Sequence, residues 1–338
     1  MVTIKDISAA SGYSQATISR LFKGDESLSI TPDTKKHIIS TALSMGYDRS
    51  KIKTTLYKIA IPFFLNRAQV IQDMYFTQVQ NALLKFGKEA NMEIQFITDR
   101  FQLAQLPEDI TGFIGVGDLT HDDLMILKQK GLKGVLLEIN LCPKHFDTVK
   151  PDTDSMTRDA IDEFLAAGFT RIGFIGGTYR NPQTGKEELD SRERVFRDYL
   201  TSKGLLQEQY IYSEGLFSID EGYQLASDMV HQLGDALPEA CFIASDTLAI
   251  GALQAFNELG IKLPGQLAII SINDNEIAQF VSPPLTTYRI DVEEMAKTAI
   301  ELLADQLTYP RHITKTVLLG SELIYRKSFV KREKQQQN

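Results

Sequence analysis

The chain has 338 residues, of which 43% are hydrophobic and 24% charged, so it can form two or three folded domains. It contains no run of about 18 uncharged apolar residues, and its first residues lack the apolar core of an export signal, so we expect a cytoplasmic protein without a membrane span. Cys142 and Cys241 lie far apart and the five histidines are scattered, so we expect neither a metal site nor a bound cofactor.

The net charge of −8 is distributed unevenly along the chain. Residues 1–58 carry nine basic and five acidic side chains, a net charge of +4, which leaves −12 on the remainder. A basic segment joined to an acidic body indicates that any binding to nucleic acid resides in the N-terminal segment.

Residues 1–47 are predicted to form a three-helix DNA-binding domain. Each helix is preceded by a hydroxyl side chain suited to capping, namely Thr3, Ser14 and Thr31. Asp6 is placed as the capping-box partner in the first helix, which Gly12 ends, and Pro32 opens a third helix that runs to Gly46. Two short helices joined by a tight turn at Gly12 are typical of a helix-turn-helix.

Side chains in and around the second helix are suited to contact with DNA. The exposed N-terminal end of such a helix can enter a major groove. Gln15 can reach base edges, Ala16 can touch a thymine methyl group, and Arg20 can pair with guanine or a phosphate. The predicted DNA-binding residues are Thr3, Ser14, Gln15, Ala16, Thr17, Ser19, Arg20, Lys23, Arg49, Lys51 and Lys53.

Residues 48–57 are polar and basic and are interpreted as a linker. From 58 to 330, short apolar runs alternate with amphipathic segments. The predicted strands are 58–65, 93–98, 112–116, 134–139, 171–176, 210–213, 240–244, 267–272 and 314–319. The predicted helices are 73–90, 121–130, 155–167, 191–203, 219–233, 246–259 and 291–306. This alternation predicts an α/β fold of parallel sheets, and its length indicates two lobes; residues 331–338 are expected to be disordered.

Motifs along almost the whole chain resemble the lactose/galactose-repressor family of bacterial regulators. In the N-terminal domain they are TIKDISAASGYSQATISRLF from Thr3, SLSITPDTKKHI from Ser27, and Met45-Gly46-Tyr47. In the body they are RIGFIGG from Arg171, FIASDTLAIG from Phe242, ISIND from Ile270 and SPPLTT from Ser282. The effector-binding half looks most like repressors of galactose or galactoside use.

The resemblance implies a body folded like a periplasmic sugar-binding protein, with a small sugar effector held between two lobes, and a homodimer that binds palindromic operator DNA. The positions that it assigns to effector binding are Glu138, Arg192, Phe217, Ser245, Asp246, Asn273 and Asp274. It implies that Arg192 grips sugar hydroxyls and that Phe217 stacks on the sugar face. Ligands of open α/β sheets bind beyond the carboxyl ends of strands, and the acidic and amide residues of this set follow apolar runs.

Each effector-site candidate also has a structural alternative. Asp246 is suited to capping the helix 246–259, and the pair Asn273-Asp274 to forming a turn. Arg192 is compatible with a surface ion pair, and Phe217 with core packing. Tyr75 and Phe76, near the start of the first helix of the body, are further candidates to line the effector site, although core packing is their favoured role.

Two features depart from the family pattern. Many members have an Ala-rich hinge helix whose Leu wedges into the minor groove, but here Tyr47 is followed by a short basic segment. We therefore expect phosphate contacts from that segment rather than a wedge formed by Leu56. The leucine-rich tail that forms tetramers is absent after Phe329, so we expect a dimer.

The residues do not indicate an enzyme, because the chain contains neither a G-x-x-x-x-G-K-[ST] loop nor a G-x-S-x-G elbow. The favoured function is repression of sugar-utilisation genes under control of a bound sugar. One alternative is a global catabolite regulator of the same family that uses a phosphorylated carrier protein as co-effector. A remote alternative, a sugar-binding transport component, would leave residues 1–47 unexplained.

Overall fold

The computed structural model describes residues 2–25, 27–65, 74–181 and 183–331. The chain divides into two compact units. The first comprises Met1–Asn66, Thr77–Lys150 and Val292–Val317, and the second comprises Arg67–Phe76, Pro151–Asp291 and Leu318–Asn338. None of the helices among the described residues is long and apolar enough to cross a membrane. The predicted disorder of 331–338 concerns residues that, apart from Lys331, lie outside the described part.

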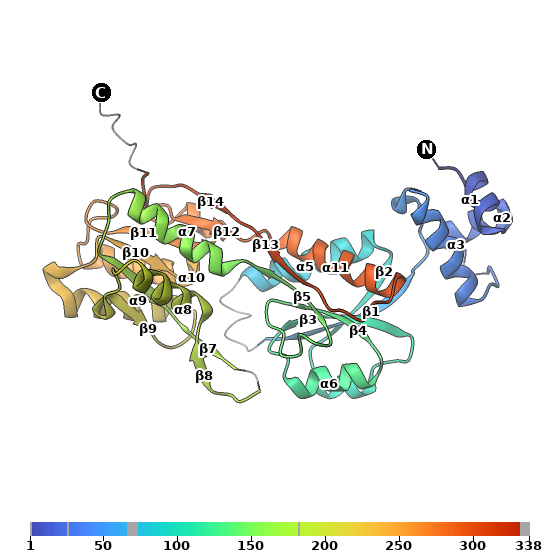
Figure 1. Cartoon of the computed structure of the whole chain (residues 1–338), viewed down its shortest axis with the longest axis horizontal. Helices are drawn as coiled ribbons and strands as arrows, with labels where there is room; N and C mark the ends of the chain where they lie inside the picture. The colour runs from blue at the N-terminus through green and yellow to red at the C-terminus, as the bar shows by residue number, and fades with distance from the viewer. Residues whose placement is uncertain (1, 26, 66–73, 182, 332–338) are drawn as a thin grey trace, which may run out of the picture. The chain divides into compact units, whose positions relative to one another are not determined.

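The N-terminal head consists of α1 (Ile4–Ser11), α2 (Gln15–Phe22) and α3 (Pro32–Ser44), as Figure 1 shows. The predicted capping box is confirmed, because the Asp6 backbone N–H donates to the Thr3 hydroxyl and the Thr3 backbone N–H donates to the Asp6 carboxylate. Gly12 adopts a φ of 78°, in the left-handed region that favours glycine, and this ends α1. The third helix ends at Ser44, slightly before the predicted Gly46.

Part of the segment interpreted as a linker packs against the head. A single 3-10 turn covers Arg49–Lys51. Ile52 is only 1% exposed and belongs to the hydrophobic core of the head. The buried Thr54 hydroxyl donates to the carbonyl of Leu21, and Leu56 is partly buried against the same core. Leu56 is therefore a packing residue in this structure.

The sheet of the first unit has the strand order β13-β5-β4-β3-β1-β2. Its strands are β1 (Tyr57–Phe64), β2 (Met92–Ile97), β3 (Ile110–Gly117), β4 (Lys133–Leu137), β5 (Asp147–Pro151) and β13 (Thr316–Leu319). The pairs from β5 to β2 are parallel. The accompanying helices are α5 (Met74–Glu89), α6 (His121–Gln129) and α11 (Val292–Thr308), with a 3-10 segment at Arg100–Gln105.

The sheet of the second unit has the order β14-β12-β11-β10-β6-β9. Its strands are β6 (Ile172–Gly176), β9 (Ile211–Ser213), β10 (Ala240–Ile243), β11 (Ala268–Asn273), β12 (Thr286–Arg289) and β14 (Glu322–Ile324). All pairs are parallel except β12–β14. The helices are α7 (Thr153–Ala166), α8 (Ser191–Ser202), α9 (Ile219–Leu233) and α10 (Asp246–Glu258). Short 3-10 segments lie at Glu208–Tyr210, Gly234–Ala236 and Glu276–Gln279, and β7 (Thr178–Arg180) and β8 (Glu187–Leu189) form an antiparallel hairpin.

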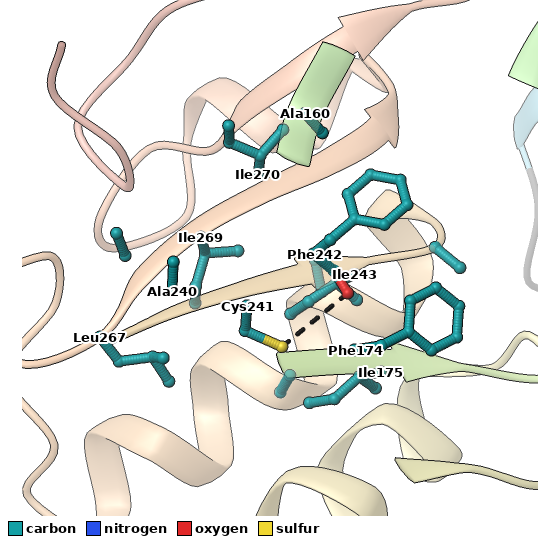
Figure 2. Close-up of a cluster of buried hydrophobic side chains, with 14 of the residues drawn as sticks. Ala160, Phe174, Ile175, Ala240, Cys241, Phe242, Ile243, Leu267, Ile269 and Ile270 are labelled. Atoms are coloured by element: carbon teal, nitrogen blue, oxygen red, sulfur yellow. Dashed lines mark hydrogen bonds between the residues drawn. The ribbon is translucent and has the colours of Figure 1, made fainter. Parts of the chain in front are cut away.

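The core of the second unit surrounds its central strands, as Figure 2 shows. Phe174, Phe242 and Ile270 are fully buried on neighbouring strands. Cys241 is also fully buried, and burial raises the pKa of its thiol, so it is an unreactive core residue. A strand buried on both faces reads as a continuous apolar run, which is why β10 and β11 were predictable from the sequence.

The predicted fold class is confirmed: the first unit begins with the three-helix head, and each unit contains a mainly parallel sheet with helices. Five strands that the sequence analysis did not predict are β5, β7, β8, β12 and β14.

Candidate functional site

The outer face of α2 presents the predicted base-reading residues to solvent. Ile18, Leu21 and Phe22 lie in the core of the head, which leaves Gln15 and Ala16 exposed on the opposite side. Two hydroxyls mark the exposed start of the helix, since the Ser14 side chain accepts from the Thr17 backbone N–H and lies 2.8 Å from the Thr17 hydroxyl. Donors and acceptors suited to base edges thus cluster at the helix N-terminus.

Arg20 is held in place by a local network that the sequence analysis did not identify. Its Nε donates to the Asp25 carboxylate at 2.7 Å and its Nη2 donates to the Ser27 hydroxyl at 3.0 Å. The hydrogen bond from Arg20 is the main reason why the pKa of Asp25 falls to about 2. The guanidinium, about half exposed, is therefore fixed at the end of α2 beside a carboxylate.

The basic side chains that follow the head differ in their surroundings. Lys23, Lys51 and Lys53 are exposed. Arg49 is partly buried, its Nη2 donates to the Ala90 carbonyl at 2.9 Å, and burial lowers its pKa. In this structure Arg49 thus contacts the end of α5, so Lys51 and Lys53 are better placed than Arg49 to reach a phosphate.

The effector-site candidates of the second unit lie where neighbouring parallel strands end. Ser245 and Asp246 follow β10, Asn273 ends β11, and Asp274 comes directly after it. Arg192 lies in the first turn of α8, and Phe217 lies in the loop between β9 and α9. Because β11, β10, β6 and β9 are adjacent in the sheet, their carboxyl ends share one edge, where open α/β sheets bind ligands.

Arg192 and Phe217 contact each other directly. The guanidinium carbon of Arg192 lies 4.4 Å from the centroid of the Phe217 ring, which is a cation–π contact. The same guanidinium donates to both carboxylate oxygens of Asp190, at 2.7 and 2.9 Å, and to the Ala244 carbonyl at 2.7 Å. Burial opposes ionisation of Asp190, but its attraction to Arg192 prevails and its pKa is lowered. Arg192 thus forms an ion pair, and Phe217 packs partly against the core, as their structural alternatives predicted.

Gly177 allows the Phe217 ring to lie close to the end of β6. A Cβ atom at this position would come within 3.2 Å of the ring and 3.1 Å of the Gly215 carbonyl. Gly177 belongs to the RIGFIGG motif, but its packing against Phe217 could not be predicted from the sequence, because a loop forty residues later supplies the ring.

Asp246 is fully buried and ties three segments together. Its carboxylate accepts hydrogen bonds from the Ser271 and Thr287 hydroxyls and from the Asn275 backbone N–H. Burial nevertheless raises the pKa of Asp246 to about 6. The capping role considered for Asp246 belongs to Ser245, whose hydroxyl accepts from the Leu248 backbone N–H.

The pair Asn273-Asp274 has an unusual backbone, with φ values of 129° and 56°. The Asp274 carboxylate accepts from Arg289 at 2.8 Å and from Arg326 at 2.6 Å, and its side chain is only 7% exposed. Both residues are partly exposed, and their positive φ values make the pair the turn that ends β11.

The remaining candidates belong to other strand and helix ends. Glu138 follows β4 in the first unit, with a φ of 66° and a backbone N–H that donates to Val149. Tyr75 and Phe76 lie at the start of α5 with their rings 5.2 Å apart, and Tyr75 is buried. Among the described residues, no group of three or more His, Cys, Asp or Glu could hold a metal ion.

Comparisons with known proteins agree with this architecture. Residues 148–329, more than half of the chain, match the periplasmic binding protein-like domain. The HTH-type transcriptional regulator GanR of Bacillus subtilis (strain 168) is 39% identical over 328 residues, which cover 97% of this chain and 99% of that protein.

Two solved structures share the fold over 97% of this chain. The transcriptional regulator CelR–cellobiose complex, covered over its full length, has a TM-score of 0.69 at 21% identity. The lac repressor dimer bound to operator and the anti-inducer ONPF, of which 98% is covered, has a TM-score of 0.68 at 19% identity. The relative at 39% identity, the matched domain and the helix-turn-helix head agree: the chain belongs to the lactose/galactose-repressor family of transcriptional regulators.

Proposed function

We propose that this protein is a repressor of sugar-utilisation genes, with galactose or a galactoside as the effector class. It binds palindromic operator DNA as a homodimer, in the cytoplasm where that DNA lies, and a small sugar changes its DNA affinity. The observation that carries the effector half of this proposal is the Arg192–Phe217 pair at the carboxyl end of the sheet.

The chemistry of this pair suits a sugar. A pyranose has an apolar face of C–H bonds and a rim of hydroxyl groups, and it therefore needs an aromatic platform beside planar hydrogen-bonding groups. Phe217 offers the platform, and Arg192 and Asn273 offer a guanidinium and an amide at the same edge. We propose Asp246 and Asp274 as residues that hold this edge together, because their carboxylates are engaged by neighbouring donors. Tyr75, Phe76, Glu138 and Ser245 stay predicted contacts.

The head supplies the DNA half of the proposal. A single α2 helix reads only one half-site, and a two-fold symmetric dimer requires a palindromic operator. The operator and dimer in the lac repressor structure and the cellobiose in the CelR complex support this assignment by family analogy. A coupling free energy of about 1–3 kcal/mol between the two ligands would change operator affinity several-fold to about a hundredfold.

A sugar panel tests the effector class. Thermal unfolding of the purified protein is measured with galactose, lactose, glucose, cellobiose and ribose, and a ligand that binds only the folded state raises the melting temperature. We expect galactose or lactose to raise it and the others to have little effect. A shift with cellobiose alone would correct the sugar class. No shift with any sugar, but a change in DNA binding with a phosphorylated carrier protein, would favour the catabolite regulator.

A further inference from the structure

The backbone at the end of β11 has positive φ values, which residues other than glycine rarely adopt. Asn273 and Asp274 both have positive φ values, in consecutive positions, at the edge that bears Arg192 and Phe217. Such residues persist where the surrounding structure holds them, and they concentrate at ligand-binding sites. The side chains that hold this turn therefore help to shape the proposed effector site.

Two arginines hold Asp274, one on each carboxylate oxygen. Arg326 Nη2 donates to Oδ1 at 2.6 Å, and Arg289 Nε donates to Oδ2 at 2.8 Å. The side chain of Arg289 is 48% exposed, whereas that of Arg326 is only 19% exposed. Water and salt weaken the more exposed pair, so Arg326 makes the stronger of the two contacts.

Arg326 also connects Asp274 to the next strand. Its Nη1 donates to the Leu285 carbonyl at 2.9 Å, and its backbone N–H donates to the Thr286 hydroxyl at 2.8 Å. One planar guanidinium thus fixes the distance between the turn after β11 and the start of β12. A lysine in its place would keep the charge but would lose this two-pronged geometry.

We propose that Arg326 is a positioning residue of the effector site, which fixes the turn at Asp274 and thereby orients the Asn273 side chain towards the sugar. The inference rests on the proposed function, because it assigns Asn273 to effector binding. Arg326 itself need not touch the sugar, because its hydrogen bonds to Asp274, Leu285 and Thr286 suffice to hold the turn.

The test is a double-mutant cycle on the full-length protein, with galactose and lactose titrated by calorimetry. Arg326→Met should weaken binding of the sugar that the wild type binds by about tenfold, a coupling typical of residues in one network. Asn273→Gly removes the proposed contact and tolerates the positive φ. In that background Arg326→Met should change the affinity by less than about twofold.

Arg289→Met is the matched control, because it removes the other guanidinium from the same carboxylate, and we expect it to change the affinity less than Arg326→Met does. The proposal would be overturned if Arg326→Met lowered sugar affinity equally with Asn273 and in the Asn273→Gly variant. It would also be overturned if Arg289→Met lowered sugar affinity as much as Arg326→Met does. If Arg326→Met does not fold, Arg326→Lys replaces it in the same cycle. We expect Arg326→Lys to lose less sugar affinity than Arg326→Met, and to lose it only when Asn273 is present. Absence of sugar binding by the wild type would instead reject the proposed function on which the inference rests.

Discussion

The guanidinium of Arg192 contacts an aromatic ring, a carboxylate and a backbone carbonyl at once. Its replacement by alanine removes the proposed hydrogen-bonding partner of the sugar hydroxyls and leaves Asp190 buried without its main partner. Each buried group that loses its partner costs about 1–3 kcal/mol. We therefore expect Arg192→Ala to lose sugar binding, measured by calorimetry, while operator binding in a mobility-shift assay stays nearly unchanged.

Arg192→Lys is the matched control, because it keeps the charge without the bidentate geometry, and it should lose only part of the affinity. Normal sugar binding by Arg192→Ala would show that Arg192 is not part of the effector site.

Arg20 is predicted to pair with guanine or a phosphate. In this structure it pairs with Asp25 and Ser27, and DNA binding would require it to exchange these partners for a guanine edge or a phosphate. Arg20→Ala should weaken operator binding by about 1–3 kcal/mol if the contact is to a base. Fluorescence anisotropy on operator and on random duplexes distinguishes the cases, because equal losses on both would identify a phosphate contact. An unchanged affinity would remove Arg20 from the interface.

Contacts with a known local spacing were predictable from the sequence, whereas other local contacts, such as that of Arg20 with Asp25, and distant contacts were not. The capping box of Thr3 and Asp6 joins residues three positions apart, so spacing alone indicated it. The contact between Asp274 and Arg326 joins residues 52 positions apart and arises only when two strands pair. No periodicity in the sequence specifies such a partner.

At the scale of elements, the helices of the body were predicted to within two residues at each end, because each carries a long amphipathic pattern. The central predicted strands, such as β10 and β11, lie on continuous apolar runs that are buried on both faces. The missed strands lack such runs: β5 reads DTVKP, β12 reads TTYR and β14 has three residues. They become strands because neighbours already in the sheet offer backbone partners, which is tertiary information.

Asp246 links strand ends of the second unit, and its burial makes a prediction about pH. Its pKa rises from 3.8 to about 6 in the folded protein, so between these values the folded state keeps a proton that the unfolded chain has lost. The contribution of Asp246 to stability therefore falls as the pH rises from about 4 to 6, by about 3 kcal/mol in total.

Asp246→Asn removes this titration. The free energy of unfolding of the wild type, minus that of the variant, should fall over this pH range in urea titrations. If this difference in the free energy of unfolding did not change with pH, the three hydrogen bonds to Asp246 would offset the effect of its burial on its pKa.

For the whole molecule, the proposed mode of DNA binding requires two heads on one operator. Each head carries one α2 helix, and the segment 1–58 has a net charge of +4, so two copies neutralise the phosphates of a two-fold site. Sedimentation of the protein with a palindromic duplex should give two chains per duplex. One chain, or four, per duplex at micromolar protein would contradict the dimer.

We propose that a sugar bound to the second unit controls the affinity of the head for DNA, and this is tested by measuring operator affinity with and without saturating sugar. We expect the sugar identified by thermal unfolding to change the dissociation constant of the operator complex by several-fold to about a hundredfold. We also expect operator DNA to change the affinity for the sugar by the same factor, because the coupling is reciprocal. An operator affinity that stays the same when the sugar is demonstrably bound would show that the two sites are not coupled.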